Sequence, residues 1–560
     1  NGIKAIETVD GDGKYTKHVS LFEGLHIFKA NTVVIEKLKE QKKLLSNGEL
    51  MHSYPHSWRA KAPLVHRATP QWFISMESHD LRKIALKALD NTIFYPSKGR
   101  ERIKSMIETR PDWCVSRQRV WGVPLPIFVS KKTKEVLIDD EVFENIADIY
   151  EKEGSDCWFG DDVQRFLGKN YKAEDYEKSN DIVEVWFDSG STHSFVLEKR
   201  DDLKWPASMY LEGSDQHRGW FHSSLLESCG TRGRAPFESI LSHGFVVDGK
   251  GLKMSKSLGN VILPEDILKK YGADILRIWV AASDYAEDLR IDHSILDQHA
   301  ESYRKIRNTF RYILGNLNDN YEKVDFANFE ISKMPELEQF MLNKIFNLNN
   351  SFKNNFDKYN FHNLYKEILN FCTVDLSAFY FDIRKDTLYC DPIDSDKRKF
   401  TILFLNIFLE ILLKWFAPIL SFTTEEIYTL VSKNNSKSIH LEQFPDIPTG
   451  WSNDTLEKKW EKLITIRNAC NISIEEKRSS KEIGSSLEAN LKINLNKNFT
   501  NIVKGTDFSE ICITSGAEIK FGDIEDIKVQ TIKAEGNKCP SCWKITKESC
   551  SRKNCAVNKS

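Results

Sequence analysis

The sequence predicts a multidomain protein of 560 residues in which a mixed α/β part is followed by an all-α part. At about 150 residues per domain, this length corresponds to three or four domains. From His52 to about Asp292, short apolar runs alternate with amphipathic stretches, the pattern of a parallel sheet with crossover helices. From about Leu296 to Val431 the apolar residues recur at helical spacing, which indicates long antiparallel helices.

The composition is that of a soluble globular protein. The hydrophobic fraction is 41% and the charged fraction 29%, which excludes wholesale disorder. The net charge of -2 excludes a histone-like polycation but allows a basic face on one domain. No apolar run is long enough to span a membrane, and the N-terminus lacks the pattern of a signal peptide. Seven cysteines are scattered singly, as in a reducing compartment, so we expect a cytoplasmic protein.

Individual elements follow from local patterns. Apolar runs bounded by turn residues predict strands at 182–187, 208–213, 240–249, 491–495 and 510–516. Outside the long helical region, amphipathic spacing predicts helices near 32–45 and 456–471. Within that region, Met341, Ile345, Leu348 and Phe352 step by four, three and four residues. A polar, proline-bearing break at 432–450 ends the helical part.

The most informative segment is Lys253-Met254-Ser255-Lys256-Ser257, followed by Leu258-Gly259-Asn260; we call residues 253–260 the lysine loop. It follows a predicted strand at 245–247 and a glycine-containing turn, and the end of a parallel strand is where α/β sheets bind phosphates. Two ammonium groups there can neutralise the charge that builds on a pentacoordinate phosphate. Two lysines with this spacing are, on their own, more often part of a solvated surface loop.

The context of the loop decides between these readings. Lys253–Ser257 resembles the second signature of the class I aminoacyl-tRNA synthetases. Tyr54–Arg59, Ala68–Phe73 and Arg110–Pro126 resemble the isoleucyl, valyl and leucyl group. Phe187–Ser194 and Leu211–Phe221 resemble the isoleucyl-tRNA synthetases, and the resemblance extends over essentially the whole chain. The family's other signature, His-x-Gly-His, does not occur in the sequence.

The resemblance implies an incomplete class I Rossmann-like catalytic domain, a helical anticodon-binding bundle and a small C-terminal zinc module. Because the missing signature belongs to the first half of the nucleotide-binding fold, we expect the chain to be the C-terminal portion of a longer enzyme. The expected domains are a remnant of the editing domain (1–50), the C-terminal half of the catalytic domain with the lysine loop (51–292), the anticodon-binding domain (293–450), an α/β junction domain (451–532) and a zinc-binding tail (533–560).

Polar residues just beyond a predicted strand form the candidate substrate site. Carboxylates and an amide at Glu212, Asp215 and Gln216 can grip a ribose hydroxyl and an ammonium group, and Gly213 allows close approach of a ligand. The resemblance implies that Glu212 contacts the aminoacyl-adenylate and that Asp215 and Gln216 help to hold it. The structural alternative is a helix N-cap at Ser214 or Asp215.

Trp186 and Trp220 are candidates for the walls of an aliphatic side-chain pocket, although a tryptophan without such context is more often a core residue. A metal-hydrolase reading depends on the histidines and aspartates nearby: His193, His217, His222, His243, Asp188 and Asp215. Their spacing lacks the i, i+4 histidine pair of a helical zinc site, which disfavours that reading. A Ser-His-Asp hydrolase is disfavoured as well, because no Gly-x-Ser-x-Gly elbow occurs.

Two parts of the sequence suggest RNA contact. Arg304, Arg307 and Arg311 share one helix face, while Ile306 and Phe310 should face the core. Such a stripe can follow phosphates, although a charged face is usually only solvated. The surrounding segment resembles the opening of the family's anticodon-binding domain.

The C-terminal tail contains four cysteines, Cys539, Cys542, Cys550 and Cys555, which fit a tetrahedral structural zinc site. The tail also carries seven Lys/Arg against two Glu, which favours RNA contact. The second pair is spaced Cys-x4-Cys, whereas the family usually has Cys-x2-Cys in both halves. The alternative is a reduced, disordered basic tail.

Together these features predict a ligase that activates L-isoleucine with ATP and Mg²⁺ and transfers it to tRNA(Ile). Lys253 and Lys256 would stabilise phosphate charge, with Lys256 contacting ATP directly, and Glu212 would hold the adenylate. The expected partners are ATP, L-isoleucine and tRNA(Ile), with no membrane, and the expected state is a monomer. Two alternatives stay open: a valyl-tRNA synthetase, or, for the isolated chain, a tRNA-binding module without ligase activity.

Overall fold

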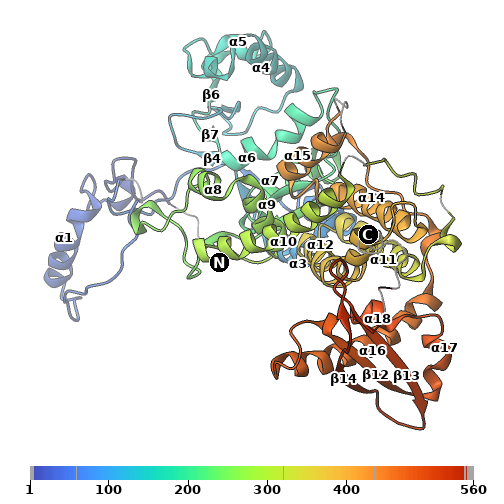
Figure 1. Cartoon of the computed structure of the whole chain (residues 1–560). Coiled ribbons are helices and arrows are strands. Elements are labelled where there is room, and N and C mark those ends of the chain that lie inside the picture. The colour runs from blue at the N-terminus through green and yellow to red at the C-terminus, as the bar shows by residue number, and fades with distance from the viewer. Residues whose placement is uncertain are drawn as a thin grey trace. The chain divides into compact units, whose positions relative to one another are not determined.

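The computed structural model describes residues 6–57, 60–318, 321–328, 330–432, 437–547 and Cys550. The chain forms two compact units, Asn1–Leu241 and Ser242–Ser560 (Figure 1). The described part contains no helix that is both long enough and apolar enough to cross a lipid bilayer.

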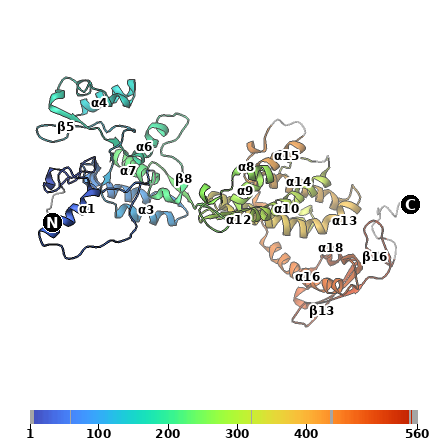
Figure 2. The same ribbon diagram turned by 90° about the vertical axis from the view of Figure 1, so that its left-hand side faces the viewer.

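The first unit is built around a three-stranded sheet with the order β2-β9-β8 (Ile93–Tyr95, Ser239–His243, Tyr210–Gly213). Strand β2 pairs in parallel with β9, which agrees with the expected crossover architecture. Three helices supply most of the core around this sheet: α2 (Leu81–Asp90), α3 (Lys98–Glu108) and α7 (Trp220–Arg232). Helices α3 and α7 lie near β8 in Figure 2.

Shorter elements surround this core. They are the antiparallel pairs β1–β3 (Phe73–Ile74, Trp113–Cys114) and β4–β7 (Ser116–Arg117, Ile182–Val183), and helices α1 (Ile27–Glu40) and α6 (Val185–Gly190). A subdomain that the sequence did not reveal has its own apolar core centred on Trp158 and Phe166. It contains the antiparallel pair β5–β6 (Phe128–Ser130, Tyr176–Lys178) and helices α4 (Asp140–Glu153) and α5 (Gln164–Leu167).

The first helix and the strand at 182–187 are present in this unit, but their predicted boundaries are wrong. The first helix is α1, five residues earlier than expected, because Nδ1 of His26 accepts a hydrogen bond from the Phe28 amide and caps the helix there. The strand predicted at 182–187 is only β7, since α6 begins at Val185. The strand ends at Val183, and the next residue, Glu184, is the N-cap of α6. Its buried carboxylate accepts a hydrogen bond from Nε1 of Trp113, and its carbonyl accepts the first bond of the helical turn.

The second unit begins with the parallel pair β10–β11 (Val246–Asp248, Leu289–Ile291). The strand predicted before the lysine loop at 245–247 is therefore present, shifted by one residue. Helices α8 (Pro264–Tyr271) and α9 (Ala273–Ala282) connect the two strands.

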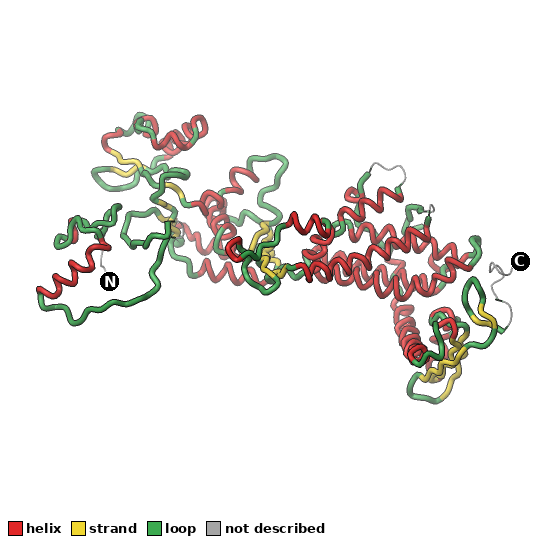
Figure 3. The backbone as a smooth tube through the Cα atoms, turned by 60° about the vertical axis from the view of Figure 1, so that its left-hand side comes forward, coloured by secondary structure: helices red, strands yellow, loops and turns green. Residues whose placement is uncertain are grey.

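The helical bundle predicted from about residue 296 is confirmed. It contains α10 (His293–Leu317), α11 (Glu336–Asp357), α12 (Phe361–Asn370), a π-helical stretch (Phe371–Phe381), α13 (Asp382–Cys390), α14 (Asp396–Phe416) and α15 (Ser421–Val431). Met341, Ile345 and Phe352 of α11 are buried, as their spacing indicated. In Figure 3 these helices, coloured red, run side by side.

A small α/β part follows. Helix α16 (Asp454–Ser479) packs on a sheet of order β13-β12-β14 (Gly516–Gly522, Ala489–Asn496, Lys528–Lys533), in which β12 is parallel to β13 and antiparallel to β14. Short helices α17 (Thr500–Val503) and α18 (Phe508–Ile511) lie between β12 and β13, and the hairpin β15–β16 (Asn537–Lys538, Ile545–Thr546) follows β14.

The strand expected at 491–495 lies within β12, but the one expected at 510–516 is wrong. The carboxylate of Asp507 accepts hydrogen bonds from the amides of Ser509 and Glu510 and starts α18 there. Ile513 then adopts a left-handed φ of 58°, so the chain turns before β13 begins. The observed classes agree with the predicted mixture of α/β and all-α parts, while the five domain boundaries stay predictions.

Candidate active site

The candidate substrate residues of the first unit gather at the end of strand β8. The sequence suggested that these residues lie just beyond the strand. Glu212 and Gly213 are instead its last two residues. The exposed carboxylate of Glu212 accepts a hydrogen bond of 3.1 Å from the Gly213 amide. A single 3₁₀ turn, Ser214–His217, then leads to helix α7.

Gln216 caps helix α7. Its Oε1 accepts a hydrogen bond of 3.0 Å from the Trp220 amide, and its Nε2 lies 3.3 Å from the Asp215 carboxylate. The structural alternative, an N-cap at Ser214 or Asp215, is not observed, since neither side chain caps the helix.

Trp186 and Gln216 meet at Gly219. A Cβ added to Gly219 would lie 2.5 Å from Oε1 of Gln216 and 2.9 Å from the Trp186 ring, so only glycine allows this approach. Trp186 is 41% exposed, which leaves much of its ring open to a ligand.

Trp220 is more committed to the core than Trp186. Its ring stacks on Tyr210 at 4.0 Å, and its Nε1 donates to the Ser189 carbonyl at 3.0 Å. One ring face is therefore already covered. The structure thus brings Glu212, Gly213, Asp215, Gln216, Trp186 and Trp220 into one neighbourhood of the first unit.

The histidines of this region are buried and not arranged as metal ligands. His193, His217 and His222 are each at most 2% exposed. Burial lowers the pKa of all three, that of His222 to about 3, so they are neutral at physiological pH. Within the part of the chain that the structure describes, the grouping suited to a metal consists of cysteines alone, which argues against the metal-hydrolase reading.

The lysine loop lies in the second unit, directly after β10. Lys253 and Lys256 are both exposed, and neither forms an ion pair with a carboxylate of the described residues. Met254, between them, is partly buried against a small apolar core that includes Ile267 and Trp279. The loop is thus anchored by its methionine, and both ammonium groups are left to solvent or a ligand.

Two residues that the sequence did not single out hold this loop. The Asn260 side chain donates to the Asp248 carboxylate at 2.9 Å and accepts from the Ser255 amide at 2.9 Å. The other oxygen of Asp248 accepts from the amides of Lys250 and Leu252. The hydrogen bond from Asn260 and those amides hold the pKa of Asp248 below its usual range. The sequence offered one signal for these two contacts. An asparagine follows Gly259 in the loop, and Asn and Asp side chains commonly form hydrogen bonds with nearby backbone.

The basic face predicted on α10 is present. Arg304, Arg307 and Arg311 are exposed on this helix, whereas Ile306 and Phe310 are buried in the bundle core. Arg304 pairs with Glu301, so part of its charge is already compensated.

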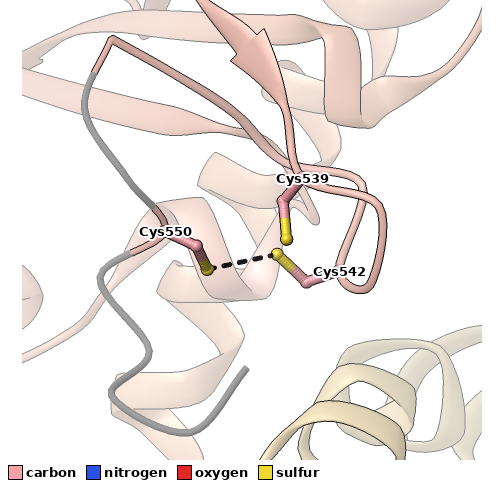
Figure 4. A group of neighbouring side chains, drawn as sticks. All are labelled: Cys539, Cys542 and Cys550. Atoms are coloured by element: carbon pink, nitrogen blue, oxygen red, sulfur yellow. Dashed lines mark hydrogen bonds between the residues drawn. The ribbon is translucent and has the colours of Figure 1, made fainter. Parts of the chain in front are cut away.

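Three of the four predicted metal-binding cysteines come together in the tail. The sulfurs of Cys539, Cys542 and Cys550 all lie within 4.8 Å of one another and face a common centre (Figure 4). Cys542 and Cys550 are 3.7 Å apart. Two sulfurs bound at about 2.3 Å to a tetrahedral zinc lie about 3.8 Å apart, so this spacing fits the ion. Cys555 lies outside the described residues.

The peptide around the first two cysteines is preorganised by backbone hydrogen bonds. The amide of Cys539 donates to the Lys544 carbonyl, and the amide of Trp543 donates back to Cys539, each at 2.9 Å. Trp543 has a left-handed φ of 62°, so the chain turns directly after Cys542. In Figure 4 the sulfurs of Cys539 and Cys542 point toward each other.

The sequence matches two family models and several curated relatives. Residues 13–292 match the family model of class I tRNA synthetases (I, L, M and V), and residues 338–493 match the anticodon-binding domain of tRNA ligases. The chain is 76% identical over 551 residues to an isoleucine–tRNA ligase of Pelagibacter ubique, covering 98% of the chain and 61% of that protein. A Brucella abortus isoleucine–tRNA ligase is 48% identical over 92% of the chain and 54% of its own length.

The chain thus spans between about half and three fifths of the length of these relatives. Among solved structures, Mycobacterium tuberculosis methionyl-tRNA synthetase bound by methionyl-adenylate is similar in fold, with a TM-score of 0.51 and 16% identity. That similarity covers 72% of this chain and 73% of the other. With the family model extending from residue 13 to 292, and so over both strand β8 and the lysine loop, the chain belongs to the class I tRNA synthetases of the isoleucine, leucine, methionine and valine group.

Proposed function

We propose that this chain is part of an isoleucine–tRNA ligase. The reaction joins the carboxylate of L-isoleucine to the α-phosphorus of ATP, releases pyrophosphate, and passes the acyl group from the adenylate to tRNA(Ile). The observation that carries the proposal is the 76% identity, over 98% of this chain, to a protein named isoleucine–tRNA ligase.

The lysine loop supplies positive charge for the first step. Attack on the α-phosphorus builds negative charge on the phosphate oxygens and on the departing pyrophosphate. Lys253 and Lys256 can stabilise that charge, with Lys256 in direct contact with ATP, and their exposure supports this role. Mg²⁺ accompanies the nucleotide, because this ion binds substrate phosphates in preference to an all-protein cage.

The end of strand β8 holds the amino acid and its adenylate. Glu212 is an exposed carboxylate at the strand end, suited to a ribose hydroxyl or an ammonium group, while Gly213 lets the ligand approach the backbone. Asp215 and Gln216 flank the same point. The open ring of Trp186 and the edge of Trp220 form apolar walls for the isoleucine side chain.

The bundle binds tRNA and the tail binds zinc. The exposed arginines of α10 provide a face for phosphates, and the match to an anticodon-binding model supports that use. Cys539, Cys542 and Cys550 hold a structural zinc ion, which would order a module too small to fold by its own core.

The test is isoleucine-dependent ATP–pyrophosphate exchange by this chain supplied in trans with a first half of the nucleotide-binding fold that carries the His-x-Gly-His signature, with valine as a parallel substrate. An apolar pocket separates the two by only about 1–3 kcal/mol, so isoleucine should be preferred by about 10-fold to 200-fold. Lys256→Ala should abolish exchange while tRNA(Ile) retention on a filter is unchanged. A preference for valine would indicate a valyl enzyme. Retention of tRNA without any exchange would support a tRNA-binding module.

A further inference from the structure

Tyr210, the first residue of strand β8, lies behind one of the proposed walls of the isoleucine pocket. Its ring stacks on that of Trp220, with the ring centroids 4.0 Å apart and the ring planes inclined by only 4°. Tyr210 is 4% exposed, so the face of Trp220 that it covers is closed to a ligand. The role inferred here for Tyr210 rests on the proposed function, in which Trp220 is a wall of that pocket.

Tyr210 is itself held on two further sides. Phe237 packs on its ring at a centroid distance of 4.9 Å. The tyrosine hydroxyl lies 3.1 Å from Oγ of Ser224, a fully buried residue of α7, and forms a hydrogen bond with it. Ser224 follows Trp220 by one helical turn, so this bond ties the tyrosine to the helix that carries the tryptophan. Tilting the tyrosine ring would therefore break the stack or the hydrogen bond.

Trp220 has a second anchor, at its indole nitrogen. Nε1 donates a hydrogen bond of 3.0 Å to the carbonyl oxygen of Ser189 in α6, the helix that also carries Trp186. Trp186 lies against Gly219, the residue before Trp220. The hydrogen bond fixes one atom of the indole, and the stack on Tyr210 fixes the plane of its ring. Together they set where the two proposed pocket walls stand relative to each other.

The plane of the Trp220 ring matters because isoleucine and valine differ by a single methylene. An apolar pocket separates two such side chains by about 10-fold to 200-fold, and it does so through contact with the extra group. A gap of about 0.5–1 Å already removes roughly a quarter to a half of the attraction between two contacting groups. A quarter of a preference of about 100-fold, taken on the logarithmic scale, corresponds to a loss of about threefold.

We propose that Tyr210 is a positioning residue for isoleucine recognition. It touches neither amino acid nor ATP; it holds the plane of the Trp220 ring, and through that ring it sets the preference for isoleucine over valine. The aromatic stack carries this role, and the hydrogen bond to Ser224 keeps the tyrosine ring parallel to the indole.

ATP–pyrophosphate exchange by the chain paired in trans with the first half of the fold measures the effect. Tyr210→Leu should lower the preference for isoleucine in kcat/KM by at least about threefold, through a higher KM for isoleucine, while the KM for ATP is unchanged. Tyr210→Phe keeps the ring and should retain the preference. The matched control is Tyr150→Leu, which removes a tyrosine ring that packs near Trp158 in the separate core of the subdomain. Both KM values should then equal those of the parent.

Fluorine NMR of the chain labelled with fluorotryptophan gives a readout that needs no enzymatic activity. The resonance of Trp220, assigned by its absence from Trp220→Phe, should move in Tyr210→Leu because the stacked ring is gone. It should stay close to its parent position in Tyr210→Phe and Tyr150→Leu. Dispersed resonances of the other tryptophans separate a folded variant from one that has merely unfolded.

The outcomes separate this role from the proposed function. If the paired parent shows no exchange with isoleucine, the proposed function fails, and the fluorine spectrum alone decides whether Tyr210 holds Trp220. If Trp220→Ala keeps the parent preference, Trp220 is not a pocket wall and the role of Tyr210 is overturned with it. If Trp220→Ala loses the preference and Tyr210→Leu keeps it, the pocket stands and the role of Tyr210 is refuted. An unmoved Trp220 resonance in Tyr210→Leu refutes it as well.

Discussion

Replacing Glu227 by glutamine should stabilise the first unit, by an amount that grows with pH. Glu227 lies on α7 with Oε1 buried and without a hydrogen-bond partner. It lines a cavity of about 350 Å³ whose other walls include Trp113 and Phe187. Burial, together with the nearby carboxylates of Asp188 and Glu184, raises the pKa of Glu227 to about 9.

The sign and size of the effect follow from this pKa. Between pH 4.5 and about 9 the unfolded chain ionises Glu227 while the folded chain keeps it protonated, so folding takes up a proton and becomes less favourable as pH rises. Each rise of one pH unit in this window lowers the free energy of unfolding by at most about 1.4 kcal/mol. At pH 7.5 the upper bound is about 4 kcal/mol, which partial exposure to water reduces to about 2 kcal/mol. Glutamine removes this cost.

Urea unfolding at pH 6, 7 and 8, followed by circular dichroism, measures the difference between variant and parent. The advantage of Glu227→Gln should widen with each step. A matched control is Glu198→Gln, because two hydrogen bonds of 2.8 Å from Arg232 lower the pKa of Glu198. That variant should be less stable than the parent by the same amount at all three pH values. Parallel pH profiles for Glu227→Gln and the parent would refute the assignment of a protonated carboxyl.

Three further substitutions test other parts of the structure. Asn260→Ala should release the lysine loop, so that trypsin cleaves at its lysines faster while cleavage elsewhere is unchanged; equal cleavage would contradict the role of the side chain. Arg384→Ala should cost about 3–5 kcal/mol in urea unfolding, because it leaves the fully buried carboxylate of Glu338 without its charged partner. Gly244→Ala should lower stability by about 1–3 kcal/mol, since the new Cβ would lie 2.3 Å from the carbonyl oxygen of Glu287, a backbone atom that cannot rotate away; a thermal midpoint equal to the parent's would exclude this contact.

The helical bundle could be predicted from the sequence because its signal is periodic and local. Met341, Ile345 and Phe352 repeat at helical spacing over three turns, and the structure buries all three. The run at 182–187 was misread for the opposite reason. A short apolar run fits a strand or a buried helix equally well. Here only Ile182 and Val183 pair with the neighbouring strand β4, and the length of this pairing, not the length of the apolar run, sets the end of β7.

The chemistry of the site was predictable where it depends on residue type and context, and not where it depends on contacts far along the chain. The lysine loop and strand β8 contain motifs that can be recognised in the sequence. Asn260 could not be ranked above any other asparagine until its hydrogen bond to Asp248 was known. Glu227 looks like a solvated helix residue until burial is measured.

The lysine loop illustrates how the fold keeps charge available for a ligand. Ordering a mobile loop would cost entropy when a ligand binds, whereas lysines paired with carboxylates would have to break those pairs. Here the Asp248 carboxylate binds the Asn260 amide and backbone N–H groups instead of the two lysines, and Met254 anchors the loop in an apolar core. Order is therefore obtained without neutralising either ammonium group. The loop sequence needs a methionine between its lysines and an asparagine after them because those two residues supply the order, and the lysines supply the charge.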